Sequence, residues 1–228
     1  MKVLSLNCRG LNGQFKRLLY FKSFTKYDII CLQETYVTAK NIDLWKFQWD
    51  GLFFYTFGTS NSKGQIILIN KRFPCDDVKF INLNDRCIGI KFFACEKLFA
   101  IFNIYAPSVK GERIGYIVSL TKEITKLNLQ NDTNILFCGD MNMVMNNTLD
   151  NISGENHSQN EVCALNNFVN TFNLIDIWRF KNPEKRDYSW ARYNPFVARR
   201  IDYTFCNKNL KNLILEAEMS HFSSGYIH

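Results

Sequence analysis

Short apolar segments recur along nearly the whole chain and are separated by polar turns. They are rich in Ile, Phe, Tyr and Val, and Gly, Asn, Asp or Lys residues punctuate them, which is typical of β-strands. The segments that predict strands are KVLSLN (2–7), DIICLQE (28–34), LFFYTF (52–57), QIILIN (65–70), VKFINL (78–83), RCIGIKFFA (86–94), KLFAIFNIY (97–105), NILFCG (134–139), DYSWAR (187–192) and RIDYTFC (200–206).

Three segments show helical rather than alternating spacing of apolar residues, namely 14–26, 111–127 and 161–172. In the first, Leu18, Leu19 and Phe24 belong to the apolar stripe, which we expect to face the core. Residues 146–160 form the one long polar stretch and predict a loop. Many strands with a few helices indicate two packed sheets with helices outside, in one domain over residues 1–228.

Composition narrows the class of protein. The chain has 228 residues, of which 46% are hydrophobic and 21% charged, as in ordinary globular domains. Lys and Arg number 28 against 21 Asp and Glu, and the resulting charge of +7 suits an acidic partner such as nucleic acid. No apolar run approaches the ~20 residues of a membrane span, and the N-terminus does not resemble a signal peptide. We therefore expect neither a membrane protein nor a secreted one.

The eight cysteines are scattered, without a C-x-x-C pair or framework spacing. Several lie in apolar strand segments, where a thiol behaves as a small buried hydrophobe. This usage predicts reduced core thiols in a cytosolic or nuclear protein.

Polar residues fall at the ends of apolar strands. Asn7, Glu34 and Tyr105 end three of them, and Asp140 and Asn142 follow a fourth. Side chains delivered to one sheet edge can assemble a polar, partly anionic site. Because the potential ligands are oxygen atoms without a Cys/His cluster, the set favours a hard cation such as Mg²⁺. A site of this kind fits phosphodiester hydrolysis.

Each of these positions also has a plain structural interpretation. Glu34 can be a solvated strand end, Asp140 and Asn142 can form a turn, and the Tyr-Ala-Pro sequence at Tyr105 can terminate a strand. The ordered set is explained less easily by turns and caps.

Six segments, spread over residues 5 to 205, resemble the endonuclease/exonuclease/phosphatase family in the family's order. They are SLNCRGL (5–11), CLQET (31–35), NIYAPS (103–108), LFCGDMN (136–142), DYSWAR (187–192) and ARRIDYTF (198–205). The N-x-R-G-L start most resembles the apurinic-type endonuclease domains of LINE-type non-LTR retrotransposons. The resemblance implies a DNase I-like α/β fold, a four-layer sandwich of two packed mixed β-sheets flanked by helices.

The resemblance also implies roles for individual residues. Glu34 would bind Mg²⁺, or Mn²⁺ as an alternative, with Asn7 supporting the metal and phosphate site. Asp140 would position or deprotonate the attacking water, and Asn142 and Tyr105 would hydrogen-bond the scissile phosphate. Preorganised donors around a pentacovalent transition state are the physical basis of such catalysis.

Asp202 would normally orient a catalytic His, and there the sequence departs from the family. The family ends in Ser-Asp-His, whereas Gly225 and Tyr226 occupy the positions of Asp and His. Three explanations stay open: the domain is a decayed DNA-binding copy, His228 replaces the missing imidazole, or His221 does.

The segment RYNPFVARR (192–200) predicts a basic hairpin tip with two aromatic residues. Related retroelement domains use this loop to probe DNA, which implies DNA contacts for Arg192, Tyr193, Phe196, Arg199 and Arg200. The alternative is a solvated basic hairpin with Phe196 packed back on the sheet.

The leading hypothesis is a Mg²⁺-dependent endonuclease that nicks double-stranded DNA and leaves a 3′-hydroxyl to prime reverse transcription. Arg9 and Ser189 are further expected DNA contacts. We expect the domain to be the N-terminal part of a retrotransposon polyprotein with a reverse transcriptase, made in the cytoplasm and acting in the nucleus. The rivals are a catalytically impaired DNA-binding relic and a family phosphatase acting on a phospholipid head group or inositol phosphate.

Overall fold

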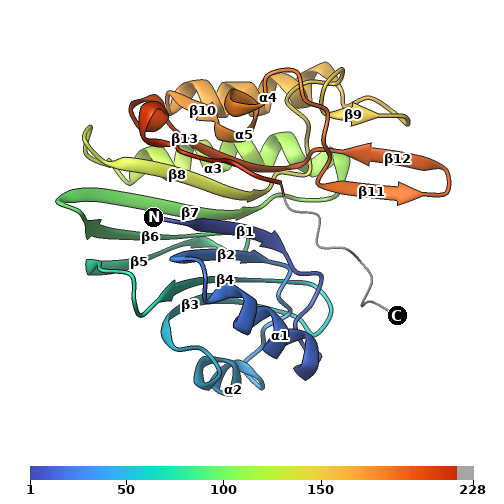
Figure 1. The fold of residues 1–228 in the computed structure, drawn as a ribbon. Coiled ribbons are helices and arrows are strands. Elements are labelled where there is room, and N and C mark those ends of the chain that lie inside the picture. Colours follow the sequence, from blue (N-terminus) through green and yellow to red (C-terminus); the bar gives the residue numbers. More distant parts are fainter. Residues whose placement is uncertain (220–228) are drawn as a thin grey trace.

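Two mixed β-sheets packed face to face form the centre of the molecule in the computed structural model, which describes residues 1–219 (Figure 1). The first sheet has the order β1 (Val3–Asn7), β2 (Ile29–Gln33), β4 (Lys63–Asn70) and β3 (Gly51–Gly58). Its first two strands are parallel and the other pairs antiparallel.

The second sheet has the order β10 (Leu174–Asp176), β13 (Asp202–Asn207), β8 (Asn134–Asp140), β7 (Lys97–Tyr105), β6 (Cys87–Ala94) and β5 (Asp76–Asn84). β7 and β8 are parallel and their neighbours antiparallel. The segments predicted as strands between residues 2 and 139 and at 200–206 are confirmed.

Helices cover the outer faces of both sheets and complete four layers (Figure 1). α1 (Gln14–Phe24) and α2 (Ile42–Phe47) lie on the first sheet, while α3 (Arg113–Lys126) and α4 (Gln159–Thr171) cover the second. The short α5 (Ile177–Lys181) and the 3₁₀ turns η1 (Lys110–Glu112) and η2 (Lys208–Leu213) complete the elements. The three predicted helices and the predicted four-layer sandwich are confirmed. Over the described residues, no helix has the length and apolar character needed to cross a membrane.

The predicted apolar stripe of α1 is right only in part. Phe24 is buried as expected, but Leu18 and Leu19 are exposed, and Arg17 and Phe21 are buried instead. The Arg17 guanidinium lies 5.0 Å from the Trp45 ring centroid and donates to the carbonyl of Leu11 at 2.9 Å. A buried cation with these partners therefore lies where the spacing predicted only apolar side chains.

The core between the sheets explains the long apolar strands. Each of the residues of β2 is buried, because one face packs on helices and the other on the second sheet. Cys31 and Cys138 lie in this inter-sheet core, and the cysteines are free thiols in the structure.

A third, small sheet projects from the sandwich at one end (Figure 1). It contains the hairpin of β11 (Trp190–Tyr193) and β12 (Phe196–Arg199), and β12 also pairs with β9 (Asn151–Ile152). The predicted hairpin tip is confirmed, although its first strand begins at Trp190 rather than Asp187. The predicted loop 146–160 is wrong in part, because its middle forms β9 and its end begins α4.

Strands β1, β2, β7 and β8 end at the same edge of the sandwich, where β13 begins. Close approach of β7 and β8 at this edge requires a glycine. Gly139 has φ +138°, and a Cβ there would lie 1.9 Å from the carbonyl oxygen of Ile104. Asp140, the next residue, is thereby brought against Tyr105, its partner in the parallel ladder.

Candidate active site

Three site residues lie in one row across the second sheet. Asp140 pairs with Tyr105 on one side and with Asp202 on the other. Paired residues on adjacent strands project from the same face, so the strand register alone gathers a phenol and two carboxylates.

Asn7 connects this row to the first sheet. Its amide nitrogen Nδ2 donates to Glu34 Oε1 at 2.8 Å and to Asp140 Oδ2 at 3.1 Å. Its oxygen Oδ1 accepts from the backbone N–H of Arg9 at 3.1 Å. The Asn7 amide nitrogen therefore bridges the carboxylates of Glu34 and Asp140.

Glu34 sits at a strained position with two further partners. Its φ is +49°, a left-handed conformation that non-glycine residues seldom adopt. The hydroxyl of Tyr36 donates to Glu34 Oε2 at 3.3 Å, and Tyr105 hydrogen-bonds to Glu34 as well. Gly10, at φ +87°, leaves room for the Tyr36 ring, since a Cβ there would lie 2.6 Å from it.

Asp140 is buried and held at both oxygens. Oδ1 accepts from the backbone N–H of Asn142 at 2.8 Å, and the Asn142 side chain donates to the carbonyl of Ala106 at 2.8 Å. Burial raises the pKa of Asp140 well above its usual range, and the neighbouring Asp202 carboxylate adds to this rise. A raised pKa makes this carboxylate a stronger base than a solvent-exposed aspartate.

Asp202 has a pKa raised to about 6 by burial. A hydrogen bond from Ser189 and the charge of Arg9 oppose this rise, while Glu34 adds to it. The predicted DNA contacts Arg9 and Ser189 therefore lie beside the carboxylates.

Tyr105 stays protonated in this environment. Burial, together with Glu34, raises the pKa of its hydroxyl well above the usual value, and the Arg86 guanidinium, 5.2 Å from the ring centroid, opposes the rise. The phenol can therefore serve as a hydrogen-bond donor at physiological pH.

The donor set fits a hard cation that keeps much of its water. In residues 1–219 no group of three or more His, Cys, Asp or Glu side chains has the arrangement of a complete metal cage. Mg²⁺ commonly binds through one or two carboxylates plus waters and substrate phosphate. Glu34, half-buried and adjacent to a second carboxylate, is the residue suited to that role.

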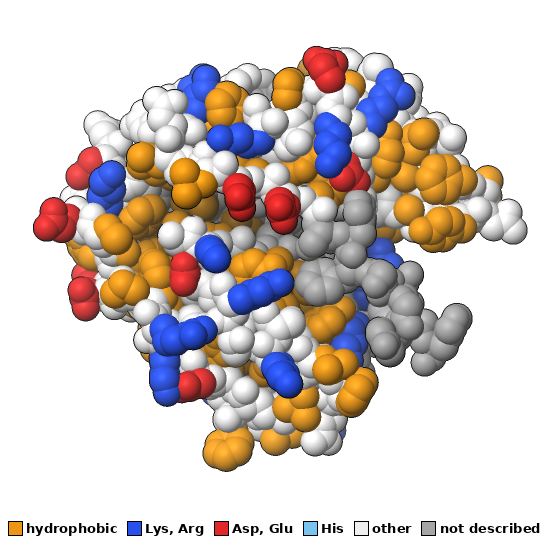
Figure 2. Space-filling view, viewed as in Figure 1, with side chains coloured by type: hydrophobic (Ala, Val, Ile, Leu, Met, Phe, Trp, Pro, Cys, Tyr) orange, Lys and Arg blue, Asp and Glu red, His pale blue; other side chains and the backbone are white. Residues whose placement is uncertain are grey.

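The hairpin tip is exposed, and the DNA contacts expected of it stay predictions. Tyr193 is 80% exposed and Phe196 46%, and their ring centroids lie 6.1 Å apart, so Phe196 is not packed back on the sheet. Arg192 is exposed too. Figure 2 shows apolar side chains gathered on this projecting hairpin. Arg199 instead binds the neighbouring loop, through Asn151 Oδ1 at 3.2 Å and the Glu155 carbonyl at 2.8 Å.

The expectation that Arg200 contacts DNA is wrong. Its side chain is 1% exposed and forms ion pairs with Asp150 at 2.8 Å and with Asp176 at 2.7 Å. A guanidinium enclosed by two carboxylates has a structural role and is not available to a phosphate.

The C-terminal positions 221–228, including Gly225, Tyr226 and both candidate histidines, lie outside the described residues. Their roles stay predictions. The roles assigned to Glu34, Tyr105, Asp140 and Asn142 also stay predictions, although the structure brings these residues together.

Sequence reasoning missed two residues that shape this region. Tyr36 directly follows the CLQET motif, so its position was the one available signal. Asp150 lies in the polar stretch 146–160, where nothing in the sequence distinguishes it from its neighbours.

Comparison with protein families gives one match that covers most of the chain. The model described as the endonuclease/exonuclease/phosphatase family matches residues 4–216. A Xenopus laevis protein described as "Transposon TX1 uncharacterized 149 kDa protein" is 24% identical over 215 residues, covering 92% of this chain. The chain spans 16% of the length of that protein. A Bacillus subtilis exodeoxyribonuclease is 25% identical over 251 residues, covering 100% of this chain and 96% of the relative.

Solved structures share the fold at lower identity. The AP endonuclease LMAP from Leishmania major superposes with a TM-score of 0.74 at 16% identity, covering 92% of this chain and 79% of that one. The endonuclease domain of TRAS1, a telomere-specific non-LTR retrotransposon, gives 0.64 at 14% identity, covering 93% and 87%. The expected DNase I-like architecture is confirmed by this similarity.

Proposed function

Because this chain belongs to the endonuclease/exonuclease/phosphatase family, we propose that it is a metal-dependent DNA endonuclease domain of a retrotransposon protein. Its product is a nick with a free 3′-hydroxyl that primes reverse transcription of the element. The observation that carries this proposal is the gathering of Glu34, Asp140 and Asp202 at one edge of the two sheets, where the Asn7 amide bridges the first two and strand pairing joins the last two.

In the proposed mechanism Asp140 accepts a proton from the attacking water. Hydrogen bonds from Asn142 and Asn7 fix both of its oxygens, and burial raises its pKa, which gives the carboxylate a higher proton affinity than an ordinary aspartate has. Tyr105 stays protonated, and its hydroxyl, which bonds to Glu34 in the free protein, turns to a phosphate oxygen when substrate binds. The second N–H of the Asn142 amide supplies another donor. These donors are held in place before the substrate arrives, which lowers the reorganisation cost at the transition state.

Glu34 would hold Mg²⁺, or Mn²⁺ in its place, and the chemistry supplied by the bound ion is neutralisation of phosphate charge. Three hydrogen bonds orient the Glu34 carboxylate, from Asn7, Tyr36 and Tyr105. They leave lone pairs for a cation because each carboxylate oxygen can accept about two contacts.

Similarity to a transposon protein and to a retrotransposon endonuclease fold supports the retroelement assignment. The basic charge of +7 and the exposed aromatic hairpin support double-stranded DNA as substrate. The proposal includes a reverse transcriptase in the same polyprotein and action in the nucleus, where target DNA is located.

One sequence observation favours a second candidate function. Gly225 and Tyr226 stand where the family has Asp and His, and loss of such a group typically reduces the rate by about 10² to 10⁴-fold. A DNA-binding relic is therefore the main rival. A phosphatase acting on small phosphate esters is less well supported, because the hairpin would then have no partner.

A supercoiled-plasmid nicking assay, run with Mg²⁺ and with EDTA, separates these candidates. The chain is compared with Asp140→Asn, with the double reversion Gly225→Asp and Tyr226→His, and with the exposed control Asp132→Asn. Nicking by the chain and the control, but not by Asp140→Asn or in EDTA, supports the endonuclease. Nicking only after reversion supports the relic, and plasmid left intact by all variants contradicts both the mechanism and the site.

A further inference from the structure

A buried carboxylate outside the candidate catalytic group lies between two arginines. Asp150 is 1% exposed and follows β8 in the loop that leads to β9. Its Oδ1 accepts from Arg200 Nε at 2.8 Å and from Arg179 Nη2 at 2.7 Å, and its Oδ2 accepts from Arg200 Nη2 at 3.1 Å. A buried charge is tolerated only with partners of this quality.

Arg200 is held through both its side chain and its backbone. Its Nη1 lies 2.7 Å from Asp176 Oδ2, and its guanidinium lies 4.4 Å and 5.2 Å from the ring centroids of Tyr203 and Trp178. Its backbone N–H also donates to the carbonyl oxygen of Asp150 at 2.9 Å. Side chain and backbone are therefore both anchored to Asp150.

This anchor lies two residues before Asp202. The backbone N–H groups of Ile201 and Asp202 both donate to Ser189 Oγ at 3.1 Å, and the carbonyl of Ile201 accepts from the N–H of Met141 at 2.8 Å. The start of β13 is thus held by Arg200 on one side and by Ser189 on the other, while Met141 connects it to Asp140, the preceding residue.

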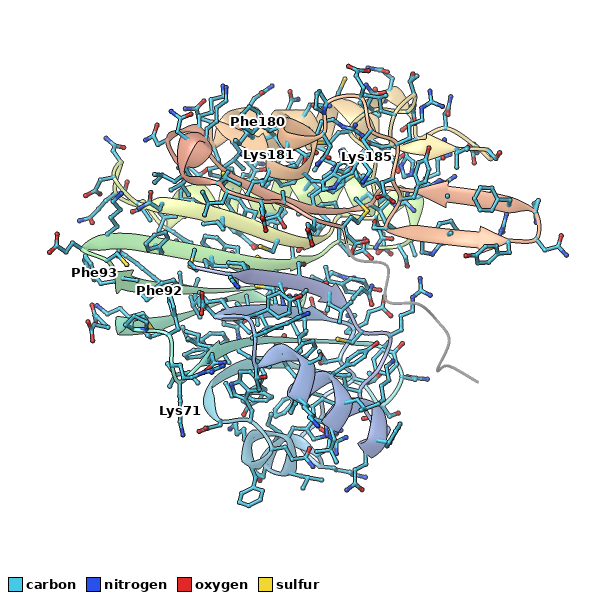
Figure 3. All side chains as sticks on the ribbon, in the orientation of Figure 1. Lys71, Phe92, Phe93, Phe180, Lys181 and Lys185 are labelled. Carbon is cyan, nitrogen blue, oxygen red and sulfur yellow. The ribbon has the colours of Figure 1, made fainter. Side chains whose placement is uncertain are left out.

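The other arginine of the network shapes the approach to the hairpin. Arg179 Nη1 donates to the carbonyls of Asn182, Pro183 and Lys185 at 3.0, 3.1 and 2.8 Å. Lys185 is exposed and, as labelled in Figure 3, lies near the root of the hairpin. Through its two arginines, Asp150 therefore connects residues 182–185, which precede the hairpin, to β13, which follows it.

We propose that Asp150 and Arg200 are positioning residues, which hold the Asp202 carboxylate and the hairpin root in fixed relation. Neither side chain reaches DNA, since both are 1% exposed. The network contains two carboxylates and two guanidinium groups, so it adds no net charge to attract DNA. Its loss therefore affects turnover of bound DNA more than affinity. This inference rests on the proposed nuclease function.

The test uses Arg200→Lys, which keeps the charge but cannot contact Asp150 twice and Asp176 as well. Arg72→Lys is the matched control, because Arg72 follows β4 at the end away from the site. Three quantities are measured on the whole chain: amide hydrogen exchange at Ile201 and Asp202, duplex DNA affinity, and the single-turnover nicking rate.

For Arg200→Lys we expect amide exchange at both positions to become at least about 10-fold faster and nicking at least about 10-fold slower. Duplex Kd should change less than about 3-fold, and Arg72→Lys should match the parent chain. Equal losses in affinity and rate would mean that Arg200 contacts DNA, and unchanged exchange would mean that it does not hold Asp202. Either result overturns the inference.

Two further arms keep the test decisive. If Arg200→Lys does not fold, Asp150→Asn is the smaller change, because it keeps the size of the side chain and one acceptor oxygen but removes the charge that binds both arginines. It should then give the same pattern, and unchanged exchange would overturn the inference. If the parent chain does not nick, the proposed function fails, while exchange and affinity still decide whether this network holds Asp202.

Discussion

Asp140 and Asp202 are direct partners across β8 and β13, so that two carboxylates project from the same face of the sheet. The first is 5% exposed and the second half-buried. Two like charges that face each other in a partly dehydrated site raise each other's proton affinity. The two carboxylates therefore repel each other at this edge, and a bound cation or a hydrogen-bond donor on the substrate can reduce this repulsion.

Replacement of Asp202 by Asn is expected to stabilise the metal-free protein at pH 7. The folded-state pKa of about 6 exceeds the ordinary value of 3.8, so the folded form releases its proton less readily and loses stability as pH rises through that interval. Above pH 6 the charged Asp202 carboxylate lowers the free energy of unfolding by about 3 kcal/mol. Thermal unfolding should show a higher Tm for Asp202→Asn at pH 7 and a smaller difference at pH 4. A lower Tm at pH 7 would contradict the assignment, and exposed Asp132→Asn serves as the control.

Glu34→Gln is expected to abolish detectable Mg²⁺ binding by titration calorimetry. The amide keeps the size of the side chain and still accepts from Asn7, but it lacks the charge that a hard cation requires. Glu184→Gln, an exposed site with no hydrogen bond or ion pair given by the structure, should bind like the parent chain. Unchanged binding by Glu34→Gln would remove this residue from the metal site.

Arg192→Ala is expected to weaken duplex DNA binding and to reduce its salt dependence by about one phosphate contact. Arg192 is exposed at the hairpin tip, next to exposed Tyr193. Lys71→Ala removes the same charge from a position far from the hairpin, as Figure 3 shows, and should leave the salt slope unchanged. Equal salt slopes for both variants would mean that the hairpin is a solvated surface feature that does not contact DNA.

His157 is expected to make the protein less stable in acid. Burial lowers the pKa of its imidazole to about 4, with the charges of Arg113 and Arg199 adding to the fall and Glu161 opposing it. In the unfolded chain the imidazole takes up a proton near pH 6.5, whereas in the folded chain it does so only near pH 4. The free energy of unfolding therefore falls as pH decreases from 6.5 to 4, by up to about 3 kcal/mol.

Denaturant unfolding between these pH values measures this effect. His157→Gln should remove much of the decline, because the substituted side chain does not titrate. An identical pH slope in the variant would show that other groups cause the acid sensitivity.

Local sequence determined the elements of this protein to a large extent. Apolar runs such as 29–33 and 100–104 form strands whose side chains are buried on both faces. Helical spacing placed the three long helices. The candidate catalytic residues were also visible, because a strand that ends in a polar residue delivers that residue to a sheet edge.

The tertiary structure alone decided which residues meet and which of them face solvent. Arg17, rather than Leu18, is buried under α1 because Trp45, distant in sequence, offers a partner to the guanidinium. Arg200 was expected at the DNA surface, yet Asp150 and Asp176 enclose it. The pairing of Asp140 with Asp202 depends on strand register, which is fixed by contacts between residues about sixty positions apart. Sequence patterns report the burial of each segment, whereas charge partners come from segments that only the folded chain brings together.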